Sequence, residues 1–194
     1  MVEYRADTGL VVVDVQNDFA DPDGSLYVAG GERVVGAVNA QVNSARGDGA
    51  PIFYTQDWHP PSTPHFEKDG GVWPVHCVGG TWGAEFHPDL VVAGPSVKKG
   101  TGGEDGYSGF TMRDPVSGEE RSTGLGEKLL EAGVERVVVV GLATDYCVKD
   151  TALDAVRLGF HTVVVAGAVA AVNLEPGDGG KALEELRAAG VTLV

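Results

Sequence analysis

The sequence predicts an α/β protein, a three-layer α/β/α sandwich built on a mainly parallel, doubly wound sheet. The first observation is a set of short apolar runs, rich in valine, that are typical of strands buried on both faces. The second is that helical patterns separate these runs, and such alternation implies right-handed crossovers and a parallel sheet. The third is that chemically useful side chains follow four of the runs, where open α/β sheets place their sites.

The expected elements follow in chain order. We expect strands over 9–15, 51–56, 136–141 and 162–166, with a weaker run at 96–98 and an edge strand at 192–194. We expect helices over 32–45, 125–132, 147–158 and 181–189. Thr123 is the expected N-cap of the second helix, and Gly133, Gly159 and Gly190 stand where helix C-caps belong.

Two segments, 57–90 and 100–122, show no clear periodicity and are rich in glycine, proline and aromatic residues. Long irregular segments in a compact domain are usually functional or disordered. The aromatic anchors of 57–90, Trp58, Phe66, Trp73, Trp82 and Phe86, argue against disorder there. We therefore expect one domain over 1–194 with an irregular insertion at 57–90.

Composition narrows the class of protein. The chain has 194 residues, 43% hydrophobic and 22% charged, which is ordinary for a soluble globular protein. A formal net charge of −14 argues against nucleic acid or an anionic membrane as partner. No apolar run approaches the roughly 18 residues of a membrane span, and the charged start is unlike a secretory signal. With only two cysteines, a reducing cytoplasm is the expected compartment.

Cys147 is the first candidate for chemistry. It follows the valine run 136–141 at the expected start of a helix. There, unpaired backbone N–H groups and the helix dipole favour the thiolate, which is the nucleophile, and could also stabilise an oxyanion. This geometry suits acyl transfer through a thioester. The alternative is inert packing, because free cysteines are usually buried as small hydrophobes.

Asp14 and a lysine pair are the candidates for acid–base work. Asp14 interrupts an apolar run, so we expect it to be buried with a raised pKa or a partner, as suits a general acid/base. The alternative is a structural carboxylate that caps a turn; Asp18 fits a turn better than catalysis. Lys98 and Lys99 follow the weak strand, and a lysine near a cysteine would lower the pKa of its thiol. Surface exposure is the alternative for both.

The segment 57–90 holds a candidate metal site. Four of the five histidines lie between positions 59 and 87. One carboxylate and three imidazoles, from Asp57, His59, His65 and His76, suit Zn²⁺, Fe²⁺ or Mn²⁺. Asp57 and His59 are two apart in extended chain and so point the same way. His87 is a rival ligand that fits capping better, and scattered loop histidines are the alternative for the whole set.

Three aromatic residues, Phe19, Trp73 and Tyr107, neighbour these polar groups in sequence. A flat heteroaromatic substrate would stack on such rings, although each ring alone could equally be core. We therefore expect a small-molecule substrate. The sequence leaves the oligomeric state open, and a homo-oligomer is compatible with it.

Together these residues resemble the nicotinamidase/pyrazinamidase family of the isochorismatase-like cysteine hydrolases, over nearly the whole chain. The segments that carry the resemblance are Asp14-Val15-Gln16-Asn17-Asp18-Phe19, Asp57-Trp58-His59, His65, Trp73-Pro74-Val75-His76-Cys77-Val78, Lys99-Gly100, Tyr107-Ser108-Gly109-Phe110 and Gly141-Leu142-Ala143-Thr144-Asp145-Tyr146-Cys147-Val148. The cysteine segment marks the wider superfamily, and the aspartate–histidine and Trp-Pro-Val-His-Cys segments mark nicotinamidases within it.

The resemblance implies a function and a role for each residue. The activity is hydrolysis of nicotinamide to nicotinate and ammonia, a step of NAD salvage, with pyrazinamide as a further substrate. The implied triad is Cys147, Asp14 and Lys99, where Lys99 is preferred because glycine follows it. The implied metal ligands are Asp57, His59, His65 and His76, for one divalent ion, with Zn²⁺ favoured over Fe²⁺ and Mn²⁺. A cis peptide before Ala143, an oxyanion hole from the backbone N–H groups of Ala143 and Cys147, and a pyridine site at Phe19, Trp73 and Tyr107 complete the set.

Three rival functions remain open at the level of sequence. The nearest is another small-amide hydrolase of the superfamily, acting on carbamoyl or ureido substrates; the full set of four metal ligands argues against it. A second is a metal-dependent hydrolase in which Cys147 only packs. The third is a catalytically inactive metal-binding scaffold protein, which the competent residues at all three triad positions disfavour.

Overall fold

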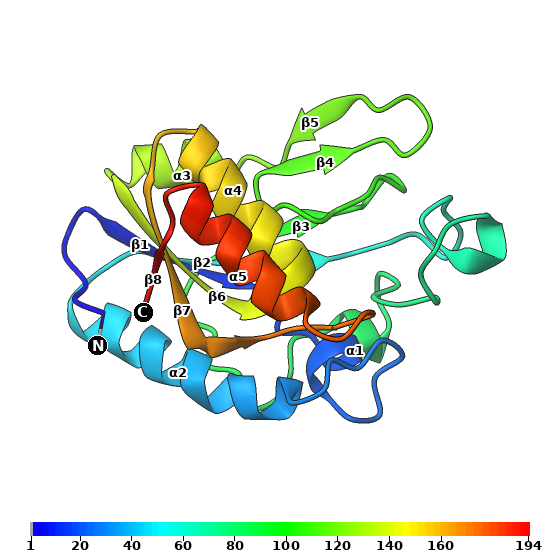
Figure 1. Ribbon diagram of the computed structural model, residues 1–194, viewed down its shortest axis with the longest axis horizontal. Helices are drawn as coiled ribbons and strands as arrows, with labels where there is room; N and C mark the ends of the chain where they lie inside the picture. The colour runs from blue at the N-terminus through cyan, green and yellow to red at the C-terminus, as the bar shows by residue number, and fades with distance from the viewer. Residues whose placement is uncertain (1) are drawn as a thin grey trace.

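The central sheet has six parallel strands in the order β3-β2-β1-β6-β7-β8 in a computed structural model that describes residues 2–194 (Figure 1). The strands are β1 (Thr8–Val13), β2 (Ile52–Asp57), β3 (Ser96–Lys99), β6 (Arg136–Leu142), β7 (His161–Ala170) and β8 (Thr192–Leu193). The predicted α/β class and parallel sheet are confirmed. Each valine run forms a strand because β-branched side chains pack well on a pleated surface that is covered on both faces.

Helices cover both faces of the sheet, as the doubly wound prediction requires. They are α1 (Asn17–Ala20), α2 (Gly31–Gly47), α3 (Leu125–Glu131), α4 (Lys149–Arg157) and α5 (Asp178–Ala188). Val12 and neighbours pack with the apolar face of α2, whereas Val11 and Val13 pack with α3, α4 and α5 on the opposite face. Figure 1 shows α2 on one side of the sheet and α4 and α5 on the other. Alternate side chains of β1 therefore belong to two apolar cores, one on each face of the sheet.

Several boundaries differ from the sequence predictions. The helical backbone starts before Cys147, in a π-helical turn (Thr144–Val148) that leads into α4. Gly124, not Thr123, is the N-cap of α3; the Thr123 hydroxyl instead accepts from Leu125 N and donates to the carbonyl of Gly109. The glycines at 133, 159 and 190 have positive φ after their helices, as predicted.

The segment 100–122, predicted to be irregular, contains an antiparallel hairpin of β4 (Thr111–Arg113) and β5 (Glu120–Ser122). Its strands have three residues each and are largely exposed, so they carry no apolar alternation for a sequence pattern to detect. The turn between them is held by the Asp114 carboxylate, which accepts from Val116 N and Ser117 N. No helix among residues 2–194 is long and apolar enough to cross a membrane.

The sheet order positions the site. Strands β3, β2, β1 and β6 are consecutive neighbours and all run parallel, so their carboxyl ends meet at one edge. Gly141 allows β6 to lie close to β1 there: its φ is +114°, and a Cβ at this position would lie 2.1 Å from the carbonyl oxygen of Val13. Side chains that follow these four strands therefore share one space.

Candidate active site and metal centre

The three candidate residues for thiol chemistry meet at this edge. Asp14 directly follows β1, Lys99 is the last residue of β3, and Cys147 lies in the turn after β6. Lys99 Nζ lies 2.7 Å from Asp14 Oδ2 and 3.6 Å from Cys147 Sγ. All three side chains are buried. The structure thus brings together residues that are far apart in the sequence.

Lys99 is the cation of this cluster. Its ammonium also contacts the Gly106 carbonyl and lies 3.6 Å from Asp57 Oδ1. Burial lowers the pKa of Lys99, but Asp14 and Asp57 outweigh burial and hold that pKa well above its usual value. Because the side chains of β3 alternate, Lys98 points away, with its ammonium 3.3 Å from the ring centroid of Trp58. The preference for Lys99 over Lys98 agrees with this geometry.

Asp14 has the environment of a proton acceptor. Burial raises the pKa of Asp14, and the charge of Asp57 adds to the rise, while Lys99 and a hydrogen bond from Thr55 oppose it. Thr55 Oγ1 donates to Asp14 Oδ1 at 2.6 Å and so orients the carboxylate. The backbone of Asp14 is left-handed, with φ of 47°, a strained conformation of the kind that clusters at functional sites. The predicted burial of Asp14 is confirmed, and its carboxylate has a partner in Lys99.

The pKa of the Cys147 thiol differs from the prediction. The helix start and a neighbouring lysine predict a lowered pKa, but burial raises the pKa of Cys147 well above its usual value. Lys99 lowers that pKa as expected, yet Asp14 and Asp57 add to the effect of burial. The physical reason is that a thiolate here would be an additional anion in a site poor in water. This direction favours the thiol over the thiolate, so a neighbouring base would assist nucleophilic attack.

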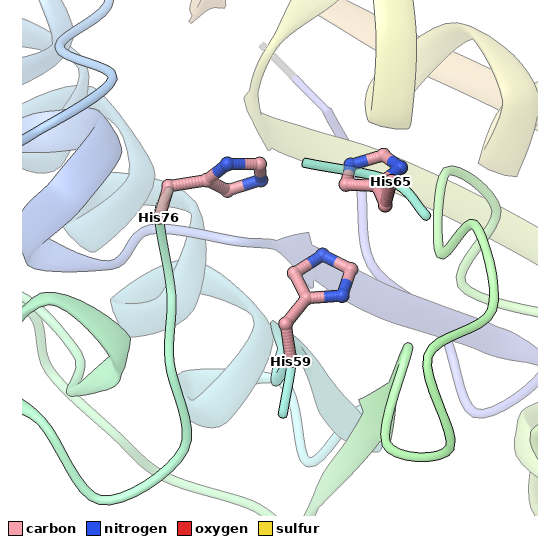
Figure 2. A group of neighbouring side chains, drawn as sticks. All are labelled: His59, His65 and His76. Atoms are coloured by element: carbon pink, nitrogen blue, oxygen red, sulfur yellow. The ribbon is translucent and has the colours of Figure 1, made fainter. Parts of the chain in front are cut away.

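Three buried imidazoles form the second cluster. His59, His65 and His76 each offer one ring nitrogen, and these nitrogens lie within 4.8 Å of one another. Figure 2 shows the three rings facing a common space. Asp57 Oδ2 lies 3.0 Å from His59 Nε2 and 3.2 Å from His76 Nε2, so the carboxylate adjoins two of the three rings. Asp57 Oδ1 is buried without a hydrogen-bond partner among the described residues.

The hydrogen bonds of the Nδ1 atoms of His65 and His76 show that these imidazoles can bind a cation through Nε2. His76 Nδ1 lies 2.7 Å from the Pro74 carbonyl oxygen, so it donates and leaves Nε2 as the free acceptor. His65 Nδ1 lies 2.6 Å from Asp105 Oδ1, with the same consequence. Neutral imidazoles with Nε2 facing a carboxylate are the donors that Zn²⁺, Fe²⁺ and Mn²⁺ use in proteins. His87 lies outside the cluster, and its Nδ1 accepts from Asp89 N, as a capping residue would.

Backbone pairing brings the distant histidines to Asp57. His59 N donates to the Cys77 carbonyl and Gly79 N to the His59 carbonyl, which places His76 beside His59. The buried ring of Phe66 packs against all three imidazoles, with ring centroids 5.3, 6.1 and 5.5 Å away. Two features thus hold the segment 57–90 in place: the backbone hydrogen bonds of His59, and the packing of Phe66 against the three imidazoles. Cys77 is buried without a disulfide, consistent with packing.

An aromatic pocket joins the two clusters. It holds about 420 Å³ of free space, including its opening to solvent, and reaches Cys147 as well as His65 and His76. The three rings named by the sequence, Phe19, Trp73 and Tyr107, line it. Trp73 Nε1 donates to the Tyr107 hydroxyl at 2.8 Å, and this bond fixes the angle between the two rings. Sequence reasoning missed three further lining side chains, Leu26, Tyr146 and Val172, and the backbone of Gly106. Of these only Tyr146 had a signal, its position next to Cys147.

Gln16 is a supporting residue that sequence reasoning also missed. Its amide donates to the carbonyls of Asp57 and Ala84, at 2.7 and 2.8 Å, and its Oε1 accepts from Asp57 N at 2.8 Å. Asp18 is the turn residue expected, since its carboxylate accepts from Ser25 N and Cys77 N. The segment that carries Asp14 therefore also fixes the backbone of Asp57 and of the loop that carries His76.

The peptide bond between Leu142 and Ala143 is cis, as the resemblance implies. Ala143 and Cys147 both line the pocket. Their backbone N–H groups as an oxyanion hole stay a prediction.

The chain is similar to a known protein family and to proteins of known structure. A family model described as an isochorismatase domain matches residues 8–194. A nicotinamidase/pyrazinamidase of Mycobacterium tuberculosis is 41% identical over 189 residues, which cover 95% of this chain and 97% of the relative. A crystal structure of the pyrazinamidase of Pyrococcus horikoshii in complex with zinc superimposes with a TM-score of 0.86 at 39% identity, covering 97% of this chain and 98% of that one. The structure of PnC1 from L. infantum in complex with nicotinate gives a TM-score of 0.90 at 36% identity, covering 100% and 95%.

Proposed function

The chain belongs to the isochorismatase family, and we propose that within it the protein is a metal-dependent cysteine amidohydrolase that converts nicotinamide to nicotinate and ammonia. One observation carries the proposal: Cys147, which contacts Lys99 and through it Asp14, lines the same aromatic pocket as His65 and His76 of the histidine cluster. The named activity of the Mycobacterium tuberculosis relative and the nicotinate bound to PnC1 of L. infantum support the substrate class. Pyrazinamide, a carboxamide on a similar flat ring, is the second substrate we propose.

The substrate would lie along the pocket between the two clusters. Its ring would stack among Phe19, Trp73 and Tyr107, with the ring nitrogen toward the histidines and the carboxamide at Cys147. A divalent ion held by Asp57, His59, His65 and His76 would supply a Lewis acid that binds the ring nitrogen and orients the substrate. Zn²⁺ is the ion we propose, since three imidazoles and one carboxylate suit it and the pyrazinamidase of Pyrococcus horikoshii binds zinc.

Chemistry would begin with removal of the thiol proton. Asp14, with its raised pKa, accepts the proton of Cys147, and the sulfur forms a bond to the carboxamide carbon. Lys99 keeps its charge and stabilises the sulfur anion and the Asp14 carboxylate in turn. The oxyanion accepts hydrogen bonds from the backbone N–H groups of Ala143 and Cys147.

The leaving group and water complete the cycle. The carbon–nitrogen bond breaks as protonated Asp14 donates to the amine, which leaves as ammonia and yields a thioester on Cys147. Asp14 then takes a proton from water, whose oxygen attacks the thioester carbon. The carbon–sulfur bond breaks, the proton on Asp14 returns to the sulfur, and the product leaves as nicotinic acid, which releases its own proton to solvent to give nicotinate. One carboxylate thus serves as base and acid twice.

The proposal is tested by ammonia release from nicotinamide, measured on protein as isolated, after chelator treatment and after addition of Zn²⁺, Fe²⁺ or Mn²⁺. Cys147→Ala is measured beside the wild type, with its metal content determined. We expect release only when both a metal and Cys147 are present. Release that needs the metal but persists in Cys147→Ala would assign the chemistry to the metal alone. No release by metal-loaded wild type would contradict the proposed substrate and direct the search to carbamoyl or ureido amides.

We also propose that the protein acts in the cytoplasm and that residues 1–194 form one domain with the metal-binding segment 57–90 inserted. Both cysteines are free thiols in the structure, which suits a reducing compartment. The segment 57–90 is hydrogen-bonded to the segment that follows β1, because the Gln16 amide donates to the carbonyls of Asp57 and Ala84; this supports a single folding unit.

A further inference from the structure

A carboxylate outside the proposed ligand set contacts one of the proposed ligands. Asp105 lies in the segment between β3 and β4, and its Oδ1 is 2.6 Å from His65 Nδ1. The His65 side chain is 4% exposed, while the Asp105 side chain is 25% exposed and lines a separate polar cavity of about 720 Å³, including its opening to solvent. Asp105 therefore stands behind His65, on the side away from the other two histidines' nitrogens.

The three histidines differ in what holds the outer nitrogen of each ring. The outer nitrogen of His76 lies against a neutral carbonyl, that of Pro74. The Nδ1 of His59 is buried and has no hydrogen-bond partner among residues 2–194. Only His65, of the three, has a carboxylate there. Because an ionised acceptor makes a hydrogen bond about twice as strong as a neutral one, the His65 ring is the most firmly oriented of the three.

The backbone holds Asp105 in place independently of any cation. Asp105 N donates to the Arg113 carbonyl at 2.7 Å, and Arg113 N donates back to the Asp105 carbonyl at 3.0 Å, which fastens Asp105 to β4. Two residues earlier, the Gly103 carbonyl accepts from Thr63 Oγ1 at 2.7 Å. The segments 63–65 and 103–105 are thus joined at two points, one neutral and one charged. The hairpin of β4 and β5, which has no part in the proposed chemistry, sets the position of the carboxylate.

We propose that Asp105 is a positioning residue of the metal centre: it holds His65 in the tautomer whose Nε2 faces the centre, and it strengthens that nitrogen as a ligand. The inference rests on the proposed function, because it concerns the same four-ligand site. Loss of such an outer partner lowers metal affinity by about 10- to 100-fold in metalloproteins.

The experiment measures Zn²⁺ affinity directly, by competition with a chromophoric chelator, without substrate. Asp105→Asn keeps an acceptor oxygen and all backbone bonds but removes the charge, and Asp105→Ala removes both the charge and the acceptor. Asp150→Asn is the matched control, because Asp150 lines the same polar cavity and has no hydrogen bond or ion pair with the three histidines among the described residues. Thermal unfolding of each metal-free protein reports any structural effect separately.

We expect the Zn²⁺ dissociation constant to rise in the order wild type, Asp105→Asn, Asp105→Ala, with about a 10- to 100-fold increase for Ala. Asp150→Asn should match the wild type, and the metal-free Asp105→Asn protein should keep the wild-type melting temperature. Equal Zn²⁺ affinity in wild type and both Asp105 variants would overturn the inference and leave the proposed function intact. A wild type that binds none of Zn²⁺, Fe²⁺ and Mn²⁺ would overturn the proposed function and this inference together.

Discussion

Replacement of Lys99 by methionine should destabilise the protein in a way that depends on pH. Lys99 and Asp14 are both fully buried, and their charged atoms lie 2.7 Å apart. At an effective dielectric constant of about 20, two unit charges at that distance attract by about 6 kcal/mol. Methionine has a similar length and no charge, so Lys99→Met leaves Asp14 without its cation. Removal of one partner from a buried ion pair typically costs about 3–5 kcal/mol.

The pH dependence arises because Asp14 of the Lys99→Met variant can take up a proton and so avoid burying an unpaired charge. An unpaired buried carboxylate takes up a proton, and burial already raises the pKa of Asp14. Protonation of a carboxyl whose pKa in the unfolded chain is about 3.9 costs at most about 5 kcal/mol at pH 7.5 and about 2 kcal/mol at pH 5.5. Between these pH values the folded variant holds a proton that the unfolded chain does not, so its stability falls as pH rises.

A second substitution isolates the term that belongs to Asp14. Asp14→Asn in the Lys99→Met background removes the carboxylate, so the double variant should be more stable than Lys99→Met. That difference should be about 5 kcal/mol at pH 7.5 and about 2 kcal/mol at pH 5.5, a change of about 1.4 kcal/mol per pH unit. Urea denaturation of chelator-treated protein at several pH values measures it. Lys98→Met is the control, because Lys98 is exposed and points away from Asp14.

Two results would refute this reasoning. One is a double variant no more stable than Lys99→Met at pH 7.5, which would mean that Asp14 carries no buried charge that needs Lys99. The other is a difference that stays constant with pH, which would assign the loss to packing rather than to charge. A Lys98→Met variant as unstable as Lys99→Met would point to a general effect of lost lysine.

Three further outcomes are expected. Gln16→Leu should lower the free energy of unfolding by at least about 2 kcal/mol in urea, because the buried N–H and carbonyl of Asp57 lose their partners; a loss below about 0.5 kcal/mol would contradict this. Gly100→Ala should lower the free energy of unfolding by about 1–2 kcal/mol, because φ at this position is +76°. The added Cβ would lie 2.6 Å from His59 Cε1, so the variant should also bind Zn²⁺ more weakly in chelator competition. Unchanged affinity would show that His59 is not a ligand. Tyr107→Phe, which removes the acceptor of the indole N–H, should raise KM about fivefold with little change in kcat in the ammonia assay, corresponding to about 1 kcal/mol; a fall in kcat alone would assign Tyr107 a catalytic role instead.

Much of the fold was predictable because local pattern and burial agree. The valine runs of β1 and β6 are apolar on both faces, and only a parallel sheet covered by helices on both sides buries such strands. The hairpin of β4 and β5 was not predictable, because its short exposed strands are held by backbone bonds to each other and to Asp105 rather than by apolar alternation. Its position matters, since Arg113 of β4 pairs with the backbone of Asp105, whose carboxylate lies behind His65.

The candidate site was predictable where the type of residue itself limits its chemistry. A lone Asp14 in an apolar run, a pair of lysines after a weak strand and a cluster of histidines after a strand each suggest a role before any geometry is known. The state of Cys147 was not predictable in this way. Local sequence indicates a thiolate. The pKa of the thiol, however, depends on Asp14, Asp57 and Lys99, which lie at the ends of three other strands.

The sequence by itself determined the kinds of element, their order and the residue types available for thiol and metal chemistry, because secondary structure and side-chain chemistry are local properties. Only the tertiary structure decided which atoms face one another: Lys99 toward Asp14 and Lys98 away, and Asp105 behind His65. It also decided that burial outweighs the nearby lysine at Cys147. The physical reason is that charge interactions and desolvation act through space, so they are set by how strands and loops distant in the chain pack at one edge of the sheet.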